Sequence, residues 1–163
     1  MIPIIVKSKI NAKDSFDAIQ QLAEQLYSLN LVKESFFEAV CRREEVYPTG
    51  LPIEGMGIAI PHTDPVHVIK SCFAIGKLAR PINFYEMGNP EGVVPVELII
   101  LMGIKKIEDH LPFMKCILDN ISSEDFIGEV RACEDSTGLK ILFGKCLSED
   151  KGFDNTYYRK KGG

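Results

Sequence analysis

The most apolar run of the chain, Val93–Ile104, sets the strongest constraint on the fold. It reads VVPVELIILMGI, is rich in β-branched residues and is too short to cross a lipid bilayer. A short continuous apolar run of this kind is typical of a strand that is buried on both faces. The sequence therefore predicts a central strand over Val96–Met102, with other elements arranged around it.

Apolar residues recur at the spacing of a helix both before and after this strand in the sequence. Asp14 or Ser15 can cap a helix whose apolar residues recur every three or four positions, and Asn30 can end it in the left-handed conformation. A second helix is expected from near Lys33 into the charged cluster Arg42–Glu45. Three more are expected after the central strand, from His110 to Ile121 with Pro112 in the first turn, over Ser122–Ala132 and over Ser136–Leu147.

The remaining segments predict further strands and loops. Strands are expected over Ile4–Val6, Gly57–Ile60, Ser71–Leu78 and Arg80–Phe84. Tyr47–Pro52 is expected to be irregular because it holds two prolines and a glycine, and Met87–Gly92 is expected to be a loop. The order of elements predicts an α/β (α+β) fold in which helices pack on a mixed β-sheet. We expect a single domain over residues 1–148 and a polar C-terminal tail over residues 149–163.

Composition excludes several classes of function. The 163 residues carry a net charge of -4 with basic residues spread along the chain, which gives no electrostatic case for binding nucleic acid or an anionic membrane. The start of the chain lacks the basic lead and long apolar core of a signal peptide, and no span is long enough for membrane insertion. The five cysteines include no C-x-x-C pair and are expected to be free thiols. A cytoplasmic protein is expected.

The segment Gly57–Asp64 is the first candidate site. Its apolar run ends at Pro61, which stops the strand and holds His62 just past the strand end. Because the ordinary pKa of histidine lies near neutrality, a neutral imidazole there is available as a nucleophile, a base or a metal ligand. An isolated histidine in a loop is, however, more often an ordinary surface or hydrogen-bonded residue.

Two further residues favour phosphate chemistry at His62. His110 precedes a helix, and the apolar runs before the two histidines are expected to pair in one sheet, so that the histidines meet at one edge. A helix N-terminus suits a phosphate, which makes a phosphohistidine site a reasonable hypothesis, although His110 can equally serve only to cap its helix. Arg43 can bind phosphate oxygens in a bidentate manner, or it can belong to a solvated helix end with local ion pairs.

Other candidates have weaker support. The hydroxyl of Thr49 can orient an imidazole or bind a phosphate, but threonines in turns also make purely local hydrogen bonds. His67 lies five residues after His62 and can share its site or be a surface residue. A metal hydrolase using His62, His67 and His110 is a further alternative, although no cysteines have zinc-ligand spacing. Nucleotide-binding and hydrolase motifs are absent from the sequence.

Four segments carry a resemblance to a known family: REEVYPTG at 43–50, IAIPH at 58–62, VELIILMGI at 96–104 and the helix start at His110–Leu111. Together they resemble the enzyme IIA domain of the fructose/mannitol class of the bacterial phosphoenolpyruvate-dependent sugar phosphotransferase system. The resemblance covers roughly residues 1–148. The YPTGL segment and the spacing of His67 are most similar to the galactitol-type branch.

The resemblance implies a phosphoryl carrier with a mixed sheet sandwiched by helices. Its phosphotransferase role would be to accept a phosphoryl group on Nε2 of His62 from the histidine-containing phosphocarrier protein. It would pass that group to a cysteine of enzyme IIB, and so serve a membrane enzyme IIC for a galactitol-like polyol or sugar. His110 would position or stabilise the group and Arg43 would steady the phosphate, with no cofactor or metal. The alternative is a regulatory module of the same fold that signals through phosphorylation of His62.

Overall fold

A long hairpin of β4 (Cys72–Glu86) and β5 (Asn89–Gly103) is the centre of the structure, a computed structural model that describes residues 2–149. Its antiparallel register runs from the pair Cys72 and Gly103 to the pair Glu86 and Asn89. A two-residue turn, Met87–Gly88, joins the strands, and Gly88 has a φ of 74°, which favours glycine. The predicted central strand is confirmed as part of β5.

The hairpin corrects two predictions. The segments over 71–78 and 80–84 form one strand rather than two, and the expected loop over Met87–Gly92 is reduced to the tight turn. Pro81 lies exposed within a register irregularity between Lys77 and Ile82. A proline at such an irregularity does not remove a regular ladder bond, so the sheet continues past it.

Three shorter strands complete the mixed sheet: β1 (Ile4–Ile10), β2 (Gly50–Leu51) and β3 (Gly57–Ala59). β1 is parallel to β4, β3 is parallel to β5, and β2 pairs antiparallel with β3. Gly50 also pairs with Glu86 at the far end of β4, so the pairings from β4 through β5, β3 and β2 return to β4. The expectation that 47–52 is wholly irregular was therefore wrong, because distant partners fix Gly50–Leu51 as a strand.

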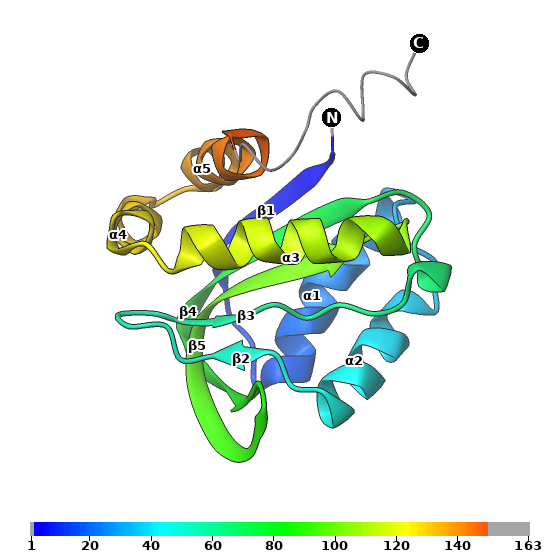
Figure 1. Cartoon of the computed structure of the whole chain (residues 1–163), viewed down its shortest axis with the longest axis horizontal. Coiled ribbons are helices and arrows are strands. Elements are labelled where there is room, and N and C mark those ends of the chain that lie inside the picture. Colours follow the sequence, from blue (N-terminus) through cyan, green and yellow to red (C-terminus); the bar gives the residue numbers. More distant parts are fainter. Residues whose placement is uncertain (1, 150–163) are drawn as a thin grey trace.

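Helices cover both faces of the sheet (Figure 1). The helices α1 (Ser15–Ser28) and α2 (Phe36–Val46) lie on one face. The helices α3 (Ile107–Ile121), α4 (Glu124–Ala132) and α5 (Ser136–Glu149) lie on the other. The predicted single-domain α/β fold, a mixed sheet sandwiched by helices, is confirmed. The predicted tail over residues 149–163 lies outside the described residues except for Glu149, which ends α5.

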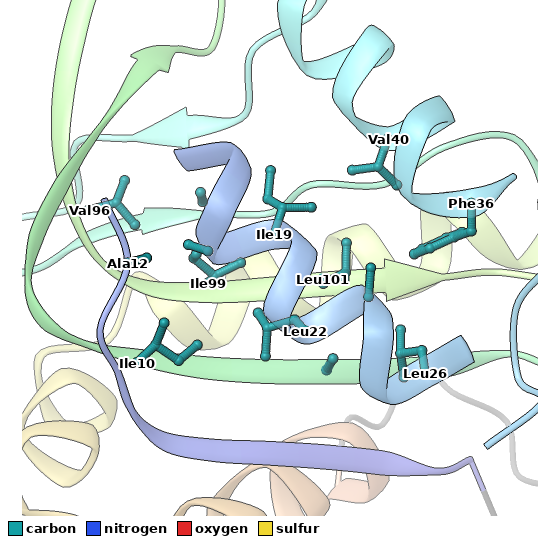
Figure 2. Packing of buried hydrophobic residues seen from close by; sticks show 14 of the residues in the cluster. Ile10, Ala12, Ile19, Leu22, Leu26, Phe36, Val40, Val96, Ile99 and Leu101 are labelled. Carbon is teal, nitrogen blue, oxygen red and sulfur yellow. The ribbon is translucent and has the colours of Figure 1, made fainter. Parts of the chain in front are cut away.

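Two apolar cores hold these layers together. Figure 2 shows the first, in which side chains of α1 and α2 such as Leu22 and Val40 pack against Ile99 and Leu101 of β5. The second lies beneath α3, α4 and α5, where Phe73 and Phe113 meet edge to face at 5.3 Å between ring centroids. Burying aromatic and aliphatic side chains on this scale is the main stabilising term of such a fold. Within residues 2–149, no helix combines the length and apolar character needed to span a membrane.

The predicted ends of α1 agree with the structure, whereas α2 begins at Phe36 rather than near Lys33 and α4 is capped by Ser123 rather than Ser122. The Asp14 side chain accepts a hydrogen bond from the Asp17 N–H at 2.8 Å, and Asn30 adopts the expected left-handed conformation with a φ of 57°. α3, in contrast, begins at Ile107 rather than at His110, so Pro112 lies inside the helix instead of in its first turn. The acidic residues at 108 and 109 favour the positive end of the helix dipole, which accounts for the earlier start.

We predict that Gly50→Ala destabilises the protein by about 1–3 kcal/mol, the usual cost of overpacking. A Cβ at this position would lie 2.5 Å from the backbone oxygen of Tyr85, which cannot move without disturbing β4. Urea denaturation would measure the change in free energy of unfolding. Gly128→Ala in α4 is the matched control, because its Cβ meets nothing within 4 Å and alanine gains about 0.5–1 kcal/mol in a helix. Equal stability of the two variants would contradict the close approach of β2 to β4.

Candidate active site

His62 is held rigidly at the C-terminal end of β3. The strand ends at Ala59, and the Pro61 carbonyl accepts a hydrogen bond of 3.0 Å from the N–H of Met102 in β5. This bond forms an isolated parallel bridge between His62 and Met102, so the predicted position just past the strand end is confirmed. The His62 side chain is buried, with 7% of its surface exposed.

The hydrogen bonding of His62 identifies its free nitrogen. Nδ1 lies 2.8 Å from the backbone oxygen of Ile60. Since a carbonyl can only accept, the proton must reside on Nδ1, which leaves the lone pair on Nε2. The pKa of His62 is lowered to about 4, chiefly because burial disfavours the charged form, with the nearby His110 and Arg43 acting in the same direction. At neutral pH the ring is therefore neutral, with a nucleophilic Nε2.

His110 lies beside this ring. The centroids of the two imidazoles are 4.8 Å apart, and their planes are inclined by 55°. Because β3 and β5 are parallel, their C-terminal ends lie at the same edge of the sheet, and α3 starts four residues after β5. The predicted meeting of the two histidines is thus confirmed. Burial, followed by the charge of Arg43, lowers the pKa of His110, so this ring is also neutral at pH 7.

Arg43 brings a positive charge to the two histidines from the last turn of α2. Its guanidinium lies 5.5 Å from the centroid of the Tyr47 ring, and Nη1 is 3.9 Å from a carboxylate oxygen of the exposed Asp64. Nε is buried and has no hydrogen-bond partner among the described residues. Leaving a buried donor without a partner costs free energy. This N–H is therefore well placed to donate a hydrogen bond to an oxygen of a bound group.

Thr49 faces away from solvent and toward a residue that the sequence reasoning missed. Its Oγ1 lies 2.9 Å from Oε2 of Glu44, and its N–H donates to Oε1 of Glu44, also at 2.9 Å. Oγ1 also accepts the N–H of Ile60 at 3.2 Å. Thr49 is 2% exposed and its single hydroxyl proton is directed to the carboxylate, so a positioning role fits its surroundings better than direct contact with a phosphate.

Glu44 could have been found from its spacing. It follows Phe36 and Val40 at intervals of eight and four residues, which places it on the buried face of α2. The neighbouring charges at 42–45 instead suggested a solvated helix end. Glu44 is 7% exposed, and its burial raises the pKa of the carboxyl, while the hydrogen bonds from Thr49 oppose that shift.

The structure pairs His67 with Ser35 instead of with His62. His67 lies in the 3-10 helix over Pro65–His67, where its Nδ1 is 2.8 Å from Oγ of Ser35. Within residues 2–149, no three His, Cys, Asp or Glu side chains are grouped so as to hold a metal ion. The groups that do come together are a neutral nucleophile, a second imidazole and a guanidinium, which can bind and transfer an anionic group such as phosphoryl.

Comparison with known proteins agrees with this chemistry. Residues 4–144 match the model of the family described as "Phosphoenolpyruvate-dependent sugar phosphotransferase system, EIIA 2". The galactitol-specific EIIA component of Escherichia coli (strain K12) is 25% identical over 147 residues, which cover 89% of this chain and 95% of that protein.

Two solved structures from Escherichia coli share the fold. The mannitol-specific cryptic phosphotransferase enzyme IIA CmtB has a TM-score of 0.67 and 19% identity, covering 88% of this chain and 92% of that one. Enzyme IIA for mannitol in complex with phosphorylated enzyme IIB has a TM-score of 0.64 and 18% identity, covering 86% of this chain and 99% of that one. The family match spans most of the sequence, and the chain therefore belongs to the EIIA 2 family of the phosphoenolpyruvate-dependent sugar phosphotransferase system.

Proposed function

We propose that His62 carries a phosphoryl group on Nε2, accepted from the histidine-containing phosphocarrier protein and passed to a cysteine of an enzyme IIB. The single observation that carries this proposal is the hydrogen bond between Nδ1 and the Ile60 carbonyl, which leaves Nε2 as the nucleophile. Membership of the EIIA 2 family supplies the class of reaction.

The transfer requires no cofactor on this chain. The Nε2 lone pair attacks phosphorus in line, and the bond between phosphorus and the donor histidine breaks as the new P–N bond forms. The ring of His62 then carries a proton on Nδ1 and phosphorus on Nε2, so it gains positive charge. The Ile60 carbonyl stabilises that charge and keeps the imidazole a good leaving group for attack by the partner's thiolate.

Arg43 and His110 are proposed to bind the phosphoryl oxygens. Arg43 has a buried Nε–H without a partner among the described residues, and its link to Asp64 is a long one of 3.9 Å to an exposed carboxylate. An incoming phosphoryl group can therefore engage the guanidinium without breaking a strong contact. His110 is neutral and lies 4.8 Å from the acceptor ring, within reach for an N–H to donate to a phosphoryl oxygen.

A galactitol-like polyol or sugar is the proposed cargo of the transport system. The support is the full-length similarity to a galactitol-specific EIIA component at 25% identity. The proposed partner is an enzyme IIB, as in the mannitol complex with the same fold, and an enzyme IIC would carry the substrate across the membrane.

We predict that incubation with phosphoenolpyruvate, enzyme I and the phosphocarrier protein adds one acid-labile phosphoryl group, and that His62→Ala accepts none. Intact-protein mass spectrometry would measure the added mass. His67→Ala is the matched histidine control and should be labelled, because its imidazole pairs with Ser35. Full labelling of the His62→Ala protein would refute the assignment.

We further predict that His62 weakens the fold as the pH falls from 6.5 to 4. Its pKa is about 4 when folded, against 6.5 for an ordinary histidine, so the unfolded chain takes up the proton first and stability is lost on acidification. The loss reaches about 3 kcal/mol at pH 4 and below. Urea denaturation at a series of pH values would compare the parent with His62→Gln, which does not titrate. If the free energy of unfolding fell equally with pH in both proteins, His62 would not be held neutral in the folded state.

A further inference from the structure

The buried carboxylate of Glu44 has no role in the site as described so far. Among residues 2–147 it forms no ion pair, and its hydrogen-bond partners are the N–H and the hydroxyl of Thr49. An ionised carboxylate is costly to bury unless hydrogen bonds compensate it. Glu44 is only 7% exposed and lies in the same helix turn as Arg43. Packing alone does not explain why a carboxyl group is buried there.

The hydrogen bonds lead from Glu44 toward the reactive histidine. A carboxylate only accepts, so the Thr49 hydroxyl proton points to Glu44. The oxygen of that hydroxyl is then free to accept the N–H of Ile60 at 3.2 Å. The orientation of the Thr49 hydroxyl is thus set by the carboxyl oxygens of Glu44.

Ile60 connects this pair to His62. Its N–H is held by Thr49, and its carbonyl, on the next peptide unit, accepts the Nδ1 proton of His62 at 2.8 Å. Ile60 lies between the last residue of β3 and the Pro61 carbonyl that accepts the Met102 N–H, and its own N–H is held by the Thr49 side chain. The connection is geometric rather than electronic, because the two hydrogen bonds use different peptide units.

We propose that Glu44 and Thr49 are positioning residues that fix the backbone of Ile60, and through it the tautomer and orientation of His62. The inference rests on the proposed function of His62 and adds two residues to its machinery. Neither residue touches the reacting atoms. Glu44 is also absent from the groups whose charges shift the pKa of His62, which are His110, Arg43 and Asp64, so it acts through geometry.

The first test is Thr49→Val, which keeps the shape of the side chain and removes the hydroxyl. Nitrogen-15 NMR of His62 should show one tautomer, with the proton on Nδ1, in the parent and a mixture of both tautomers in the variant. The rate of phosphoryl acceptance should fall about tenfold, short of the ~10⁴-fold loss that follows when a catalytic imidazole is held in the wrong tautomer. Thr49→Ser, which keeps the hydroxyl, should restore the parent tautomer and rate.

Ile127→Val in α4 controls for a general loss of stability. It removes one buried methyl group and so weakens the core, and it should leave both the tautomer and the rate unchanged. An unaltered His62 tautomer in the Thr49→Val protein would overturn the proposal. That outcome is distinct from failure of the proposed function, in which the parent protein itself would accept no phosphoryl group.

The second test is Glu44→Gln. The amide can still accept the Thr49 N–H, but its NH₂ group offers a donor where the Thr49 hydroxyl needs an acceptor. We therefore expect the same mixture of His62 tautomers as in Thr49→Val. The Glu44→Gln, Thr49→Val double variant should be no slower than Thr49→Val alone, because both changes break one chain of contacts. Additive losses in rate would show that Glu44 acts independently and would contradict the shared role.

Discussion

The parallel pairing of β3 with β5 is the constraint on which the site depends. Parallel neighbours place their C-terminal ends at the same edge of a sheet, so the segments that leave β3 and β5 emerge together. One segment carries His62 and the other leads into α3 with His110. The bridge from Met102 to the Pro61 carbonyl extends this pairing to His62 itself. Two histidines 48 positions apart in sequence are brought to ring contact by backbone hydrogen bonds.

Burial gives the site its chemical character. His62 keeps a neutral ring because desolvation opposes its protonation, and Arg43 and His110 oppose it as well. The same environment would favour a phosphoryl anion, which interacts well with a guanidinium and with N–H donors in partly buried surroundings. An imidazole that resists protons and a neighbourhood that accepts negative charge are complementary requirements for carrying a phosphoryl group between proteins.

Much of this arrangement could be predicted from the sequence. Periodicity located α1, and Pro61 located the end of β3, because both signals depend on neighbouring residues only. The short strand β2 could not be seen, because its two residues form a strand only through pairing with other segments, at Ala59 in β3 and at Glu86 at the far end of β4. The length of the hairpin could not be seen either, because the pairing of the strands continues past an irregularity that contains the exposed Pro81. Glu44 was missed because its charge suggested solvent, although its spacing from Val40 indicated the core.

Within residues 2–149, β1 pairs on one side only, with β4, whereas the pairings among β4, β5, β3 and β2 return to β4. β1 carries two lysines, Lys7 and Lys9, within its seven residues. Repeated positive charges on an open strand oppose the addition of a like strand from a second copy. Lys7 and Lys9 thus protect the open side of β1 against pairing with a second copy of the chain.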